Sequence, residues 1–375
     1  MIPLPSELAA RLAAGGREVT LVVVRLAALG DILRTLPAVR LLRRGAPQVR
    51  IVWVADDRWA DVVEGHSDLA QVVRFPRRAT DRLRASPAGW PRLSGPLRRF
   101  VSELRDATRA TPHAAVIDFH GNLRSGLIGA ASGARVRLGF EGHQQKEGNR
   151  LLTTHRVPVG ERRESRIDRN LRLVRALGFP TAPLPAGGLP IRQADEARAA
   201  GIVRDSFGEG SSCAVISPGA SARQAYKKPP SGLLAAAART LADRGTGSLV
   251  VWGPGEEDDA RRVVDLAPGA CRLAPPTDLP TLTALLRHAR LFVGGDTGPL
   301  HLACAVSCPV VAIYGPTDPV VNAPWGVPHA AVFPPERAYV GIPRVDRVAG
   351  GFEGIDERQV AEAVDLVVNA PRQAR

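Results

Sequence analysis

The sequence is poor in several features, and each shortage argues against a class of protein. Its 375 residues contain four cysteines and no run of about 18 apolar residues, so neither a disulfide framework nor a membrane-spanning helix is expected. The opening residues, MIPLPSELAARLAAGG, lack a basic segment followed by an apolar one, so no secretory signal is predicted. The cysteines are expected to be buried free thiols in a reducing cytosol.

The short motifs that hold common cofactors are also missing. The chain has no Gly-x-Gly-x-x-Gly after a first strand, no Walker A string, no His-Glu-x-x-His and no Cys-x-x-Cys. It has no Asp-x-Asp pair either, which holds magnesium or manganese in many sugar transferases. We therefore expect no metal site and no cofactor.

Lysine is scarce, since the chain has 47 arginines and three lysines. Where arginine is the default cation, a lysine is a candidate for a site that needs a compact point charge. Two of the three, Lys227 and Lys228, are adjacent and follow a glycine turn, which makes them candidates for such a site.

The excess of positive over negative charge is confined to the N-terminal half of the chain. Residues 1–180 carry a net charge of +14 and residues 181–375 a net charge of −1. Such a one-sided field favours an anionic partner, namely nucleic acid, a membrane surface or an acidic substrate. Within the basic half, residues 74–109 are dense in arginine and proline, which predicts a loop that runs into a basic helix from about Pro96.

Strand and helix patterns alternate along both halves. Residues 19–25 (VTLVVVR) form a continuous apolar run that is typical of a buried parallel strand, and residues 31–44 have the apolar spacing of a helix. Further strands are predicted at residues 49–55, 69–75, 113–119, 134–140, 214–217, 248–252, 291–294 and 309–314. This alternation predicts an α/β protein with doubly wound parallel sheets.

A segment rich in proline and glycine, residues 178–189 (GFPTAPLPAGGL), predicts a linker between two domains. The N-terminal domain is expected at residues 1–182 and the C-terminal domain at residues 190–356. The last helix, residues 357–370, has the option of packing back on the N-terminal domain.

The strongest candidate for a ligand site is the string LFVGGDTGPLH, residues 291–301, because ligands of open α/β sheets bind where strands end. Pro299 falls in a first helical turn, whose free N–H groups and positive dipole end suit a phosphate. Thr297 could add a hydroxyl donor. Asp296 carries the wrong charge for a phosphate and is better suited to a sugar hydroxyl. N-capping by Asp296 or Thr297 is the structural alternative.

Two further strings of the C-terminal half follow strands. ISPGASARQAYKKPP contains a glycine turn, Ser221 as a donor, and Lys227 and Lys228, which could neutralise a departing diphosphate. A solvated basic turn is the alternative. In WGPGEEDD the acids fall in a first helical turn, where they favour the helix dipole. One of these carboxylates could instead bind the two hydroxyls of a ribose.

The N-terminal half offers two candidate loops. In RLAALGDILRTLP, Asp31 follows the first strand and could be a helix cap or a general base, while Gly30 would let a substrate approach the backbone. In DFHGNLRS, His120 and Arg124 would project near the same crevice, with local packing as an equal alternative.

Taken together, these strings resemble the ADP-heptose:lipopolysaccharide heptosyltransferases, glycosyltransferase family 9, over residues 19–330. VVVRLAALGDILRTLPAVRLLR resembles the opening strand, loop and helix of the family, and GGDTGPLHLACAVSCPVVAIYGPTDP resembles its donor loop. The resemblance implies a GT-B architecture, with two Rossmann-like doubly wound domains facing a central cleft. Acceptor would bind to the N-terminal domain and donor to the C-terminal domain.

The resemblance further implies an inverting, metal-independent transfer of heptose from ADP-heptose to a lipopolysaccharide inner-core acceptor of the Kdo–lipid A type. Asp31 matches the catalytic aspartate that deprotonates the acceptor hydroxyl, and Lys227 matches the phosphate lysine. The implied donor contacts are Ser221, Lys228, Glu257, Asp296, Thr297, Gly298 and His301. The expected acceptor contacts are Gly30, Arg77, Arg78, His120 and Arg124, with Arg74, Arg98 and Arg99 on the same basic surface.

The chain departs from the family pattern in two places. Pro229-Pro230 follows the lysines where Trp-Pro is usual, and the spacing from Ser221 to Lys227 is longer. Asp118-Phe119-His120-Gly121 stands where the family has Asp-x-Gln-Gly. The first departure leaves open which lysine holds the phosphate, and the second leaves the acceptor open.

The expected partners are an ADP-sugar donor and an anionic lipopolysaccharide core acceptor. The protein is expected to be cytoplasmic, in peripheral contact with the cytoplasmic face of the inner membrane. One alternative is a family 9 enzyme that uses another nucleotide sugar or acceptor, and a second is a sugar-nucleotide epimerase of the same two-domain architecture. A nucleic-acid-binding protein is disfavoured, because no RNA or DNA motif accompanies the basic half.

Overall fold

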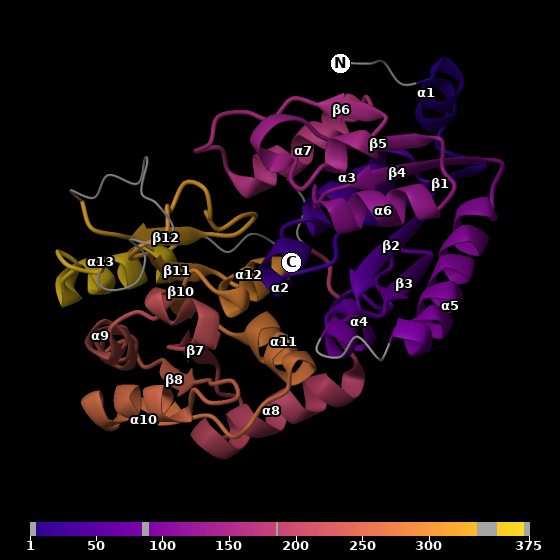
Figure 1. Ribbon diagram of the computed structural model, residues 1–375. Coiled ribbons are helices and arrows are strands. Elements are labelled where there is room, and N and C mark those ends of the chain that lie inside the picture. Colours follow the sequence, from indigo (N-terminus) through magenta and orange to yellow (C-terminus); the bar gives the residue numbers. More distant parts are fainter. Residues whose placement is uncertain (1–4, 85–89, 185–186, 336–350, 371–375) are drawn as a thin grey trace. The chain divides into compact units, whose positions relative to one another are not determined.

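The computed structural model describes residues 5–84, 90–184, 187–335 and 351–370. The chain divides into two compact units, Met1–Pro190 and Ile191–Arg375 (Figure 1). The division falls one residue beyond the segment rich in proline and glycine that the sequence marks as a linker. Each unit contains one parallel sheet with helices packed on it.

The sheet of unit 1 has six parallel strands in the order β3-β2-β1-β4-β5-β6. The strands are β1 (Val19–Val24), β2 (Arg50–Asp56), β3 (Gln71–Phe75), β4 (His113–Asp118), β5 (Val136–Phe140) and β6 (His155–Val157). The chain builds outward from β1 to β3 and then resumes at β4 on the other side of β1. Residues 19–24 are all buried, as expected for a strand covered on both faces.

Helices cover this sheet because alternate strand residues point to opposite faces. They are α1 (Ser6–Ala13), α2 (Leu29–Leu33), α3 (Leu36–Gly45), α4 (Arg77–Arg84), α5 (Trp90–Arg109), α6 (Leu123–Ala131) and α7 (Arg166–Ala176). Val22 and Val24 of β1 pack in one core with Phe100 and Leu104 of α5 and Ile128 of α6. Helices α5 and α6 therefore share one face of the sheet.

Two helix predictions in this unit are wrong, and proline explains both. The helix expected over residues 31–44 is split into α2 and α3, because Pro37 has no N–H to continue the hydrogen bonds of α2. The basic helix expected from about Pro96 begins at Trp90, and it is preceded by α4 where a loop was expected. Another proline, Pro91, occupies the first turn of α5, where proline is tolerated, and the helix continues through Pro96.

The sheet of unit 2 repeats this topology, with the order β12-β11-β10-β7-β8-β9 and all strands parallel. Its strands are β7 (Cys213–Ser217), β8 (Gly247–Val250), β9 (Cys271–Leu273), β10 (Phe292–Gly295), β11 (Val310–Ile313) and β12 (His329–Val332). Its α-helices are α8 (Gln193–Phe207), α9 (Ser231–Ala242), α10 (Glu257–Leu266), α11 (Leu279–His288), α12 (Gly298–Ala305) and α13 (Glu357–Val368). All four cysteines are buried thiols that form no disulfide. Along the part of the chain that the structure describes, no helix is both long and apolar enough to cross a membrane.

The last helix, α13, packs within unit 2, whereas the sequence also left it the option of packing back on the N-terminal domain. Val360, Val364 and Val367 are buried in one core with residues of α9 and β12. Glu357 at the start of α13 also forms an ion pair with Arg239 of α9, 2.8 Å long. The apolar side of α13 packs against α9 and against the edge strand β12 of unit 2.

This placement predicts a large difference between two substitutions on the same helix. Val364→Asp would bury an unpaired carboxylate and is expected to lower the free energy of unfolding by about 3–5 kcal/mol. Leu366→Asp, at a position that is 66 % exposed, should change it by no more than about 0.5 kcal/mol. Denaturant unfolding of the full chain measures both values, and equal effects would contradict the packing of α13 on unit 2.

Candidate active site

Each sheet reverses its strand order at one point, and polar side chains gather there. In unit 1 the reversal lies between β1 and β4, and in unit 2 between β7 and β10. Ligands of open α/β sheets bind beyond the carboxyl ends of the strands at such a point. The strings selected from the sequence around Asp31 and His120, and around Lys227 and Asp296, follow these four strands. The structure thus brings them together in two groups, one in each unit.

Asp31, in the first turn of α2, is surrounded by three arginines. Its carboxylate lies 2.6 Å from Arg25 at the end of β1, 2.9 Å from Arg34 at the end of α2 and 3.0 Å from Arg166 at the start of α7. The Asp31 side chain is 20 % exposed, so it can still meet a ligand. Capping of α2 by the Asp31 side chain is not observed, because the N-cap of that helix is Ala28.

The arginines decide the charge of Asp31. Burial alone would raise the pKa of this carboxyl, but the charges of Arg25, Arg34 and Arg166 outweigh it and hold the pKa well below its ordinary value. Asp31 is therefore a carboxylate at neutral pH. It is also a weak proton acceptor for as long as all three guanidinium groups remain bound to it.

Asp118, at the end of β4, shapes the second loop of unit 1. Its buried carboxylate accepts hydrogen bonds from the backbone N–H groups of His120 and Gly121 and from the side chains of Ser125 and Asn149, at 2.7–3.0 Å. Gly121 has a φ of 75°, and a Cβ there would lie 2.6 Å from the Gln144 carbonyl oxygen. Asp118 and Gly121 thus hold the backbone conformation of the loop that carries His120.

His120 is a neutral imidazole next to these charges. Burial lowers its pKa to about 3, and the positive charge of Arg25 acts in the same direction. The charges of Asp31 and Arg124 also reach this ring. Arg124 itself lies over the ring of Phe75, 5.9 Å from its centroid. The loops after β1 and β4 therefore form one electrostatic cluster around Asp31 and His120.

The lowered pKa of His120 makes stability depend on pH. Unfolded chains take up a proton on this ring below pH 6.5, whereas the folded protein does so only near pH 3, so stability is lost as the pH falls below 6.5. When the pH falls from 7 to 5, the parent is expected to lose about 1–2 kcal/mol of stability because of this ring. His120→Gln has no ring to protonate, so its stability should fall by that much less. Thermal unfolding at both pH values measures this difference. If His120→Gln keeps the full pH dependence of the parent, the assignment of this dependence to His120 is refuted.

The other arginines predicted to contact the acceptor lie beside local acids. Arg77 pairs with Asp81, 2.8 Å away, and the backbone N–H of Arg78 donates to the Asp57 carboxylate. Arg74 pairs with Asp61 and Glu64. These contacts lie around β3 and α4, at the outer end of the strand order rather than at the reversal point. Arg98 and Arg99 lie on α5.

In unit 2, Lys227 and Asp296 join the loops that follow β7 and β10. The Lys227 Nζ atom lies 3.0 Å from Oδ2 of Asp296 and 3.0 Å from its backbone carbonyl oxygen. His301 of α12 approaches the other carboxylate oxygen of Asp296 at 3.3 Å. The side chains of Asp296 and His301 are 2 % exposed, and that of Lys227 is 14 % exposed. Lys227 is thus held at the reversal point with its charge paired.

The two adjacent lysines point to different elements. Lys228 Nζ lies 2.5 Å from the Asp259 carboxylate on α10, and both side chains are 28 % exposed. Lys227 is the final residue of a 3₁₀ helix, η5 (Ala222–Lys227), which begins after Ser221. Only Lys227 reaches the β10 loop through a contact seen among the described residues.

Glycines permit the close approach of these loops. A Cβ on Gly295 would lie 2.7 Å from the Lys227 carbonyl oxygen, and one on Gly294 would lie 2.9 Å from the Ser217 carbonyl oxygen. Thr297 is the N-cap residue of α12, and its side chain makes no capping hydrogen bond. Side-chain capping by Thr297 is therefore not observed, and the buried Asp296 carboxylate beside the first turn contacts Lys227 and His301.

The carboxylate at the β7 turn is that of Glu256, which was not among the residues predicted from the sequence. Its side chain accepts a hydrogen bond from the Gly253 N–H at 3.0 Å, and a Cβ on Gly219 would lie 1.9 Å from its Oε2 atom. Glu257, the residue that was selected, pairs instead with Arg261 along α10 at 2.5 Å.

No group of three or more His, Cys, Asp and Glu side chains that could hold a metal ion occurs among residues 5–84, 90–184, 187–335 and 351–370. The positive groups at the two reversal points are arginines in unit 1 and a lysine in unit 2.

Comparison with known proteins assigns the chain to a family. The family model described as glycosyltransferase family 9 (heptosyltransferase) matches residues 101–339, more than half of the chain. The protein belongs to glycosyltransferase family 9. As a member of that family it is a transferase enzyme, and its matched segment includes Lys227 and Asp296 but begins after Asp31.

Individual relatives of this glycosyltransferase agree with the family match. The lipopolysaccharide heptosyltransferase 1 of Escherichia coli (strain K12) is 25 % identical over 308 residues, which cover 81 % of this chain and 90 % of the relative. A glycosyl transferase family 9 structure from Veillonella parvula DSM 2008 has a TM-score of 0.73 and 19 % identity, covering 95 % of this chain and 99 % of the other. The structure of E. coli heptosyltransferase WaaC with ADP-2-deoxy-2-fluoro heptose has a TM-score of 0.63 and 23 % identity, covering 92 % and 98 %.

These structures share the fold of this glycosyltransferase, and the GT-B prediction of two Rossmann-like units is confirmed. The identity of the family is confirmed as well. The roles of single residues stay predictions, and the geometry above supplies the arguments for them.

Proposed function

We propose that this glycosyltransferase moves a heptose from ADP-heptose to a lipopolysaccharide inner-core acceptor of the Kdo–lipid A type. The proposed donor agrees with the ADP-heptose analogue named for the E. coli WaaC structure, and the proposed acceptor with the name of the E. coli relative. The observation that carries the proposal is the pair of half-sites: an ionised Asp31 at one reversal point and a paired Lys227 at the other.

In the donor half-site, Lys227 exchanges its partner when the donor binds. Its ammonium group moves from Asp296 to the diphosphate, which carries more negative charge than the carboxylate. The freed Asp296 oxygen then accepts hydrogen bonds from sugar hydroxyls, while His301 holds the other oxygen. The Ser221 hydroxyl and the N–H groups of Thr297 and Gly298 add donors to the phosphates. We assign the ribose hydroxyls to Glu256 in place of Glu257, and Lys228 stays with Asp259.

In the acceptor half-site, the three arginines attract the anionic groups of the acceptor. Carboxylates of Kdo and phosphates of lipid A compete with Asp31 for Arg25, Arg34 and Arg166. Each guanidinium group that turns to the acceptor raises the pKa of Asp31, so the carboxylate becomes a better base when the acceptor is bound. His120 stays neutral and can hydrogen bond to an acceptor hydroxyl. Gly30 leaves room for the acceptor beside the backbone.

The reaction is a single displacement at the anomeric carbon. The acceptor hydroxyl oxygen attacks from the face opposite the diphosphate, the bond from carbon to phosphate oxygen breaks, and the anomeric configuration inverts. Asp31 takes the hydroxyl proton, and Lys227 with the first turn of α12 stabilises the charge that develops on ADP. Because the chain supplies this positive charge itself, the proposed mechanism uses no metal ion. The reaction takes place at the cytoplasmic face of the inner membrane, where the lipid acceptor is presented.

The donor is tested by thermal unfolding with a panel of nucleotides and nucleotide sugars. At about 100 times its dissociation constant, ADP-heptose should stabilise the protein by about 2.7 kcal/mol, more than UDP- or GDP-sugars at the same concentration. A larger shift with another nucleotide would favour a family 9 enzyme with a different donor. Incubation with donor alone is the second arm, since conversion of the sugar without an acceptor would indicate an epimerase.

A further inference from the structure

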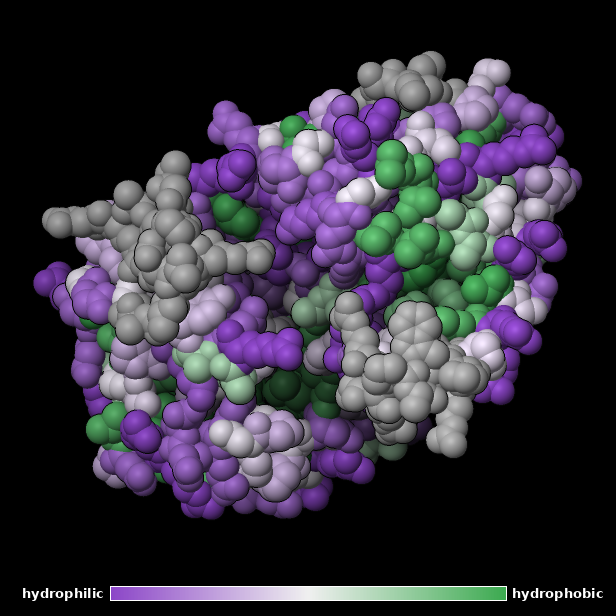
Figure 2. Space-filling view, viewed as in Figure 1, coloured by the Kyte–Doolittle hydropathy of each residue, from purple (hydrophilic) through white to green (hydrophobic). Residues whose placement is uncertain are grey.

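An apolar surface of unit 1 is left open beside the β4 loop. Leu123 and Leu127 lie one turn apart on α6 and are 41 % and 53 % exposed. Leu151, in the 3₁₀ helix η4 (Asn149–Leu151) that packs against α6, is 80 % exposed. Figure 2 shows hydrophobic residues gathered on this side of unit 1, over α6 and the neighbouring part of α5. We call Leu123, Leu127 and Leu151 the leucine surface.

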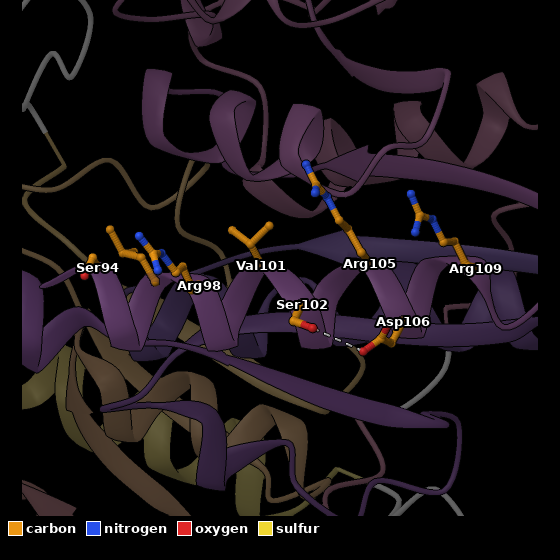
Figure 3. A pocket seen from close by; sticks show the side chains of 8 residues that line it. Ser94, Arg98, Val101, Ser102, Arg105, Asp106 and Arg109 are labelled. Atoms are coloured by element: carbon orange, nitrogen blue, oxygen red, sulfur yellow. Dashed lines mark hydrogen bonds between the residues drawn. The ribbon is translucent and has the colours of Figure 1, made fainter.

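A basic groove on α5 borders the leucine surface. It has a volume of about 540 Å³ and is lined by Leu97 and Val101 together with Arg98, Arg105 and Arg109. Figure 3 shows the three arginines extending from the same side of α5 as Val101. Arg105 also donates to the carbonyl oxygen of Ala131 at the end of α6, 3.0 Å away. Arg105 therefore stands at the end of the helix that carries Leu123 and Leu127.

These arginines are not neutralised locally. Among the described residues, no carboxylate pairs with Arg98, Arg105 or Arg109, unlike the arginines around β3 and α4. The one acid that lines the groove, Asp106, accepts a hydrogen bond from Ser102. Exposed leucines beside unpaired guanidinium groups match the apolar interior and the anionic phosphates of a lipid surface.

We propose that the leucine surface and the three α5 arginines form a docking site for an anionic lipid bilayer. The leucines enter the boundary between headgroups and acyl chains, and Arg98, Arg105 and Arg109 bind lipid phosphates. The inference rests on the proposed function only in that a lipid acceptor gives the enzyme a reason to bind a membrane. Since α6 starts directly after the β4 loop, docking through it holds the acceptor half-site close to the bilayer.

A second copy of the chain fits this surface less well than an anionic lipid bilayer does. In a symmetric dimer the same patch faces itself, so the arginines of one copy would oppose those of the other. Residues 1–180 carry a net charge of +14, which adds to this repulsion and favours an anionic partner.

The test is co-sedimentation of the full chain with vesicles of phosphatidylcholine, with and without about one third phosphatidylglycerol. The protein should bind the anionic vesicles, and binding should weaken as salt is raised. The triple variant L123Q/L127Q/L151Q should lower the partition coefficient by about tenfold, because three apolar side chains no longer leave water. The matched control L266Q/L366Q, which alters exposed leucines of unit 2, should bind like the parent.

The arginines are tested in the same way. R98Q/R105Q/R109Q should lose most binding to anionic vesicles, whereas R98K/R105K/R109K should retain most of it, since the charge is kept. Parent-like circular dichroism and unfolding midpoints establish that each variant is folded. Absence of binding by the parent, or equal binding by the parent and L123Q/L127Q/L151Q, would overturn the proposal. So would a leucine variant that dissociates a dimer and still binds vesicles, which would assign the surface to a second copy.

A further measurement separates this proposal from the proposed function. L123Q/L127Q/L151Q should transfer heptose normally to an acceptor stripped of its acyl chains and several times more slowly to an acceptor embedded in vesicles. If the parent binds vesicles through these residues but transfers no heptose, the proposed function fails and the docking site stands. If the parent transfers heptose but the substitutions leave vesicle binding unchanged, the docking site is refuted and the proposed function stands.

Discussion

Asp31→Asn is expected to lower the rate of heptosyl transfer by about 10²- to 10⁴-fold, because the amide cannot take the proton of the acceptor hydroxyl. The substitution keeps the shape of the side chain and removes its charge. ADP binding should be unchanged, since the donor half-site belongs to unit 2 and the Asp31 contacts are with Arg25, Arg34 and Arg166. Single-turnover transfer and ADP titration measure the two effects.

A surface carboxylate of the same unit provides the control. Asp61, whose side chain is 77 % exposed, contacts Arg74, and Asp61→Asn should leave transfer within about twofold of the parent. Transfer by Asp31→Asn at a rate near that of the parent would exclude Asp31 as the base. Loss of ADP binding in the same variant would mean that the substitution disturbs more than proton transfer.

Lys227→Met is expected to lower transfer by about 10²- to 10³-fold, because the departing diphosphate loses its main positive charge. The substitution also leaves the buried Asp296 carboxylate without its lysine, so the free energy of unfolding should fall as well. Transfer is therefore measured well below the unfolding midpoint of the variant, and ADP affinity is determined alongside it.

The neighbouring lysine is the matched control for this prediction. Lys228→Met breaks a contact with Asp259 between side chains that are both 28 % exposed, so its effects on transfer and on stability should be small. The reverse result, with Lys228→Met inactive and Lys227→Met active, would assign the diphosphate to Lys228. Equal and modest losses in both variants would argue against a single phosphate lysine.

Local sequence pattern was sufficient for the fold class and for the loops at the strand ends on which the proposed half-sites are built. Apolar runs such as residues 19–25 mark strands that are buried on both faces, and the strings with glycine that follow them mark the strand ends. These signals lie within a few residues of one another, so they can be read without knowing the tertiary structure. Short elements were missed, among them β6 and β9 with three residues each, because three residues are too few to show the periodicity of a strand.

The tertiary structure decided which side chains meet. Asp31 and Arg166 are 135 positions apart, and Lys227 and Asp296 are 69 apart, so no local pattern records that they form ion pairs. The choice of Glu256 over Glu257 depends on which way two adjacent side chains leave the start of α10. The amphipathic pattern of α13 predicts that it packs on something, but only the open face beside α9 specifies where. Residue type and spacing therefore determined the elements and the chemistry available at their ends, whereas partner choice, charge state and burial arise from contacts between distant segments and required the folded chain.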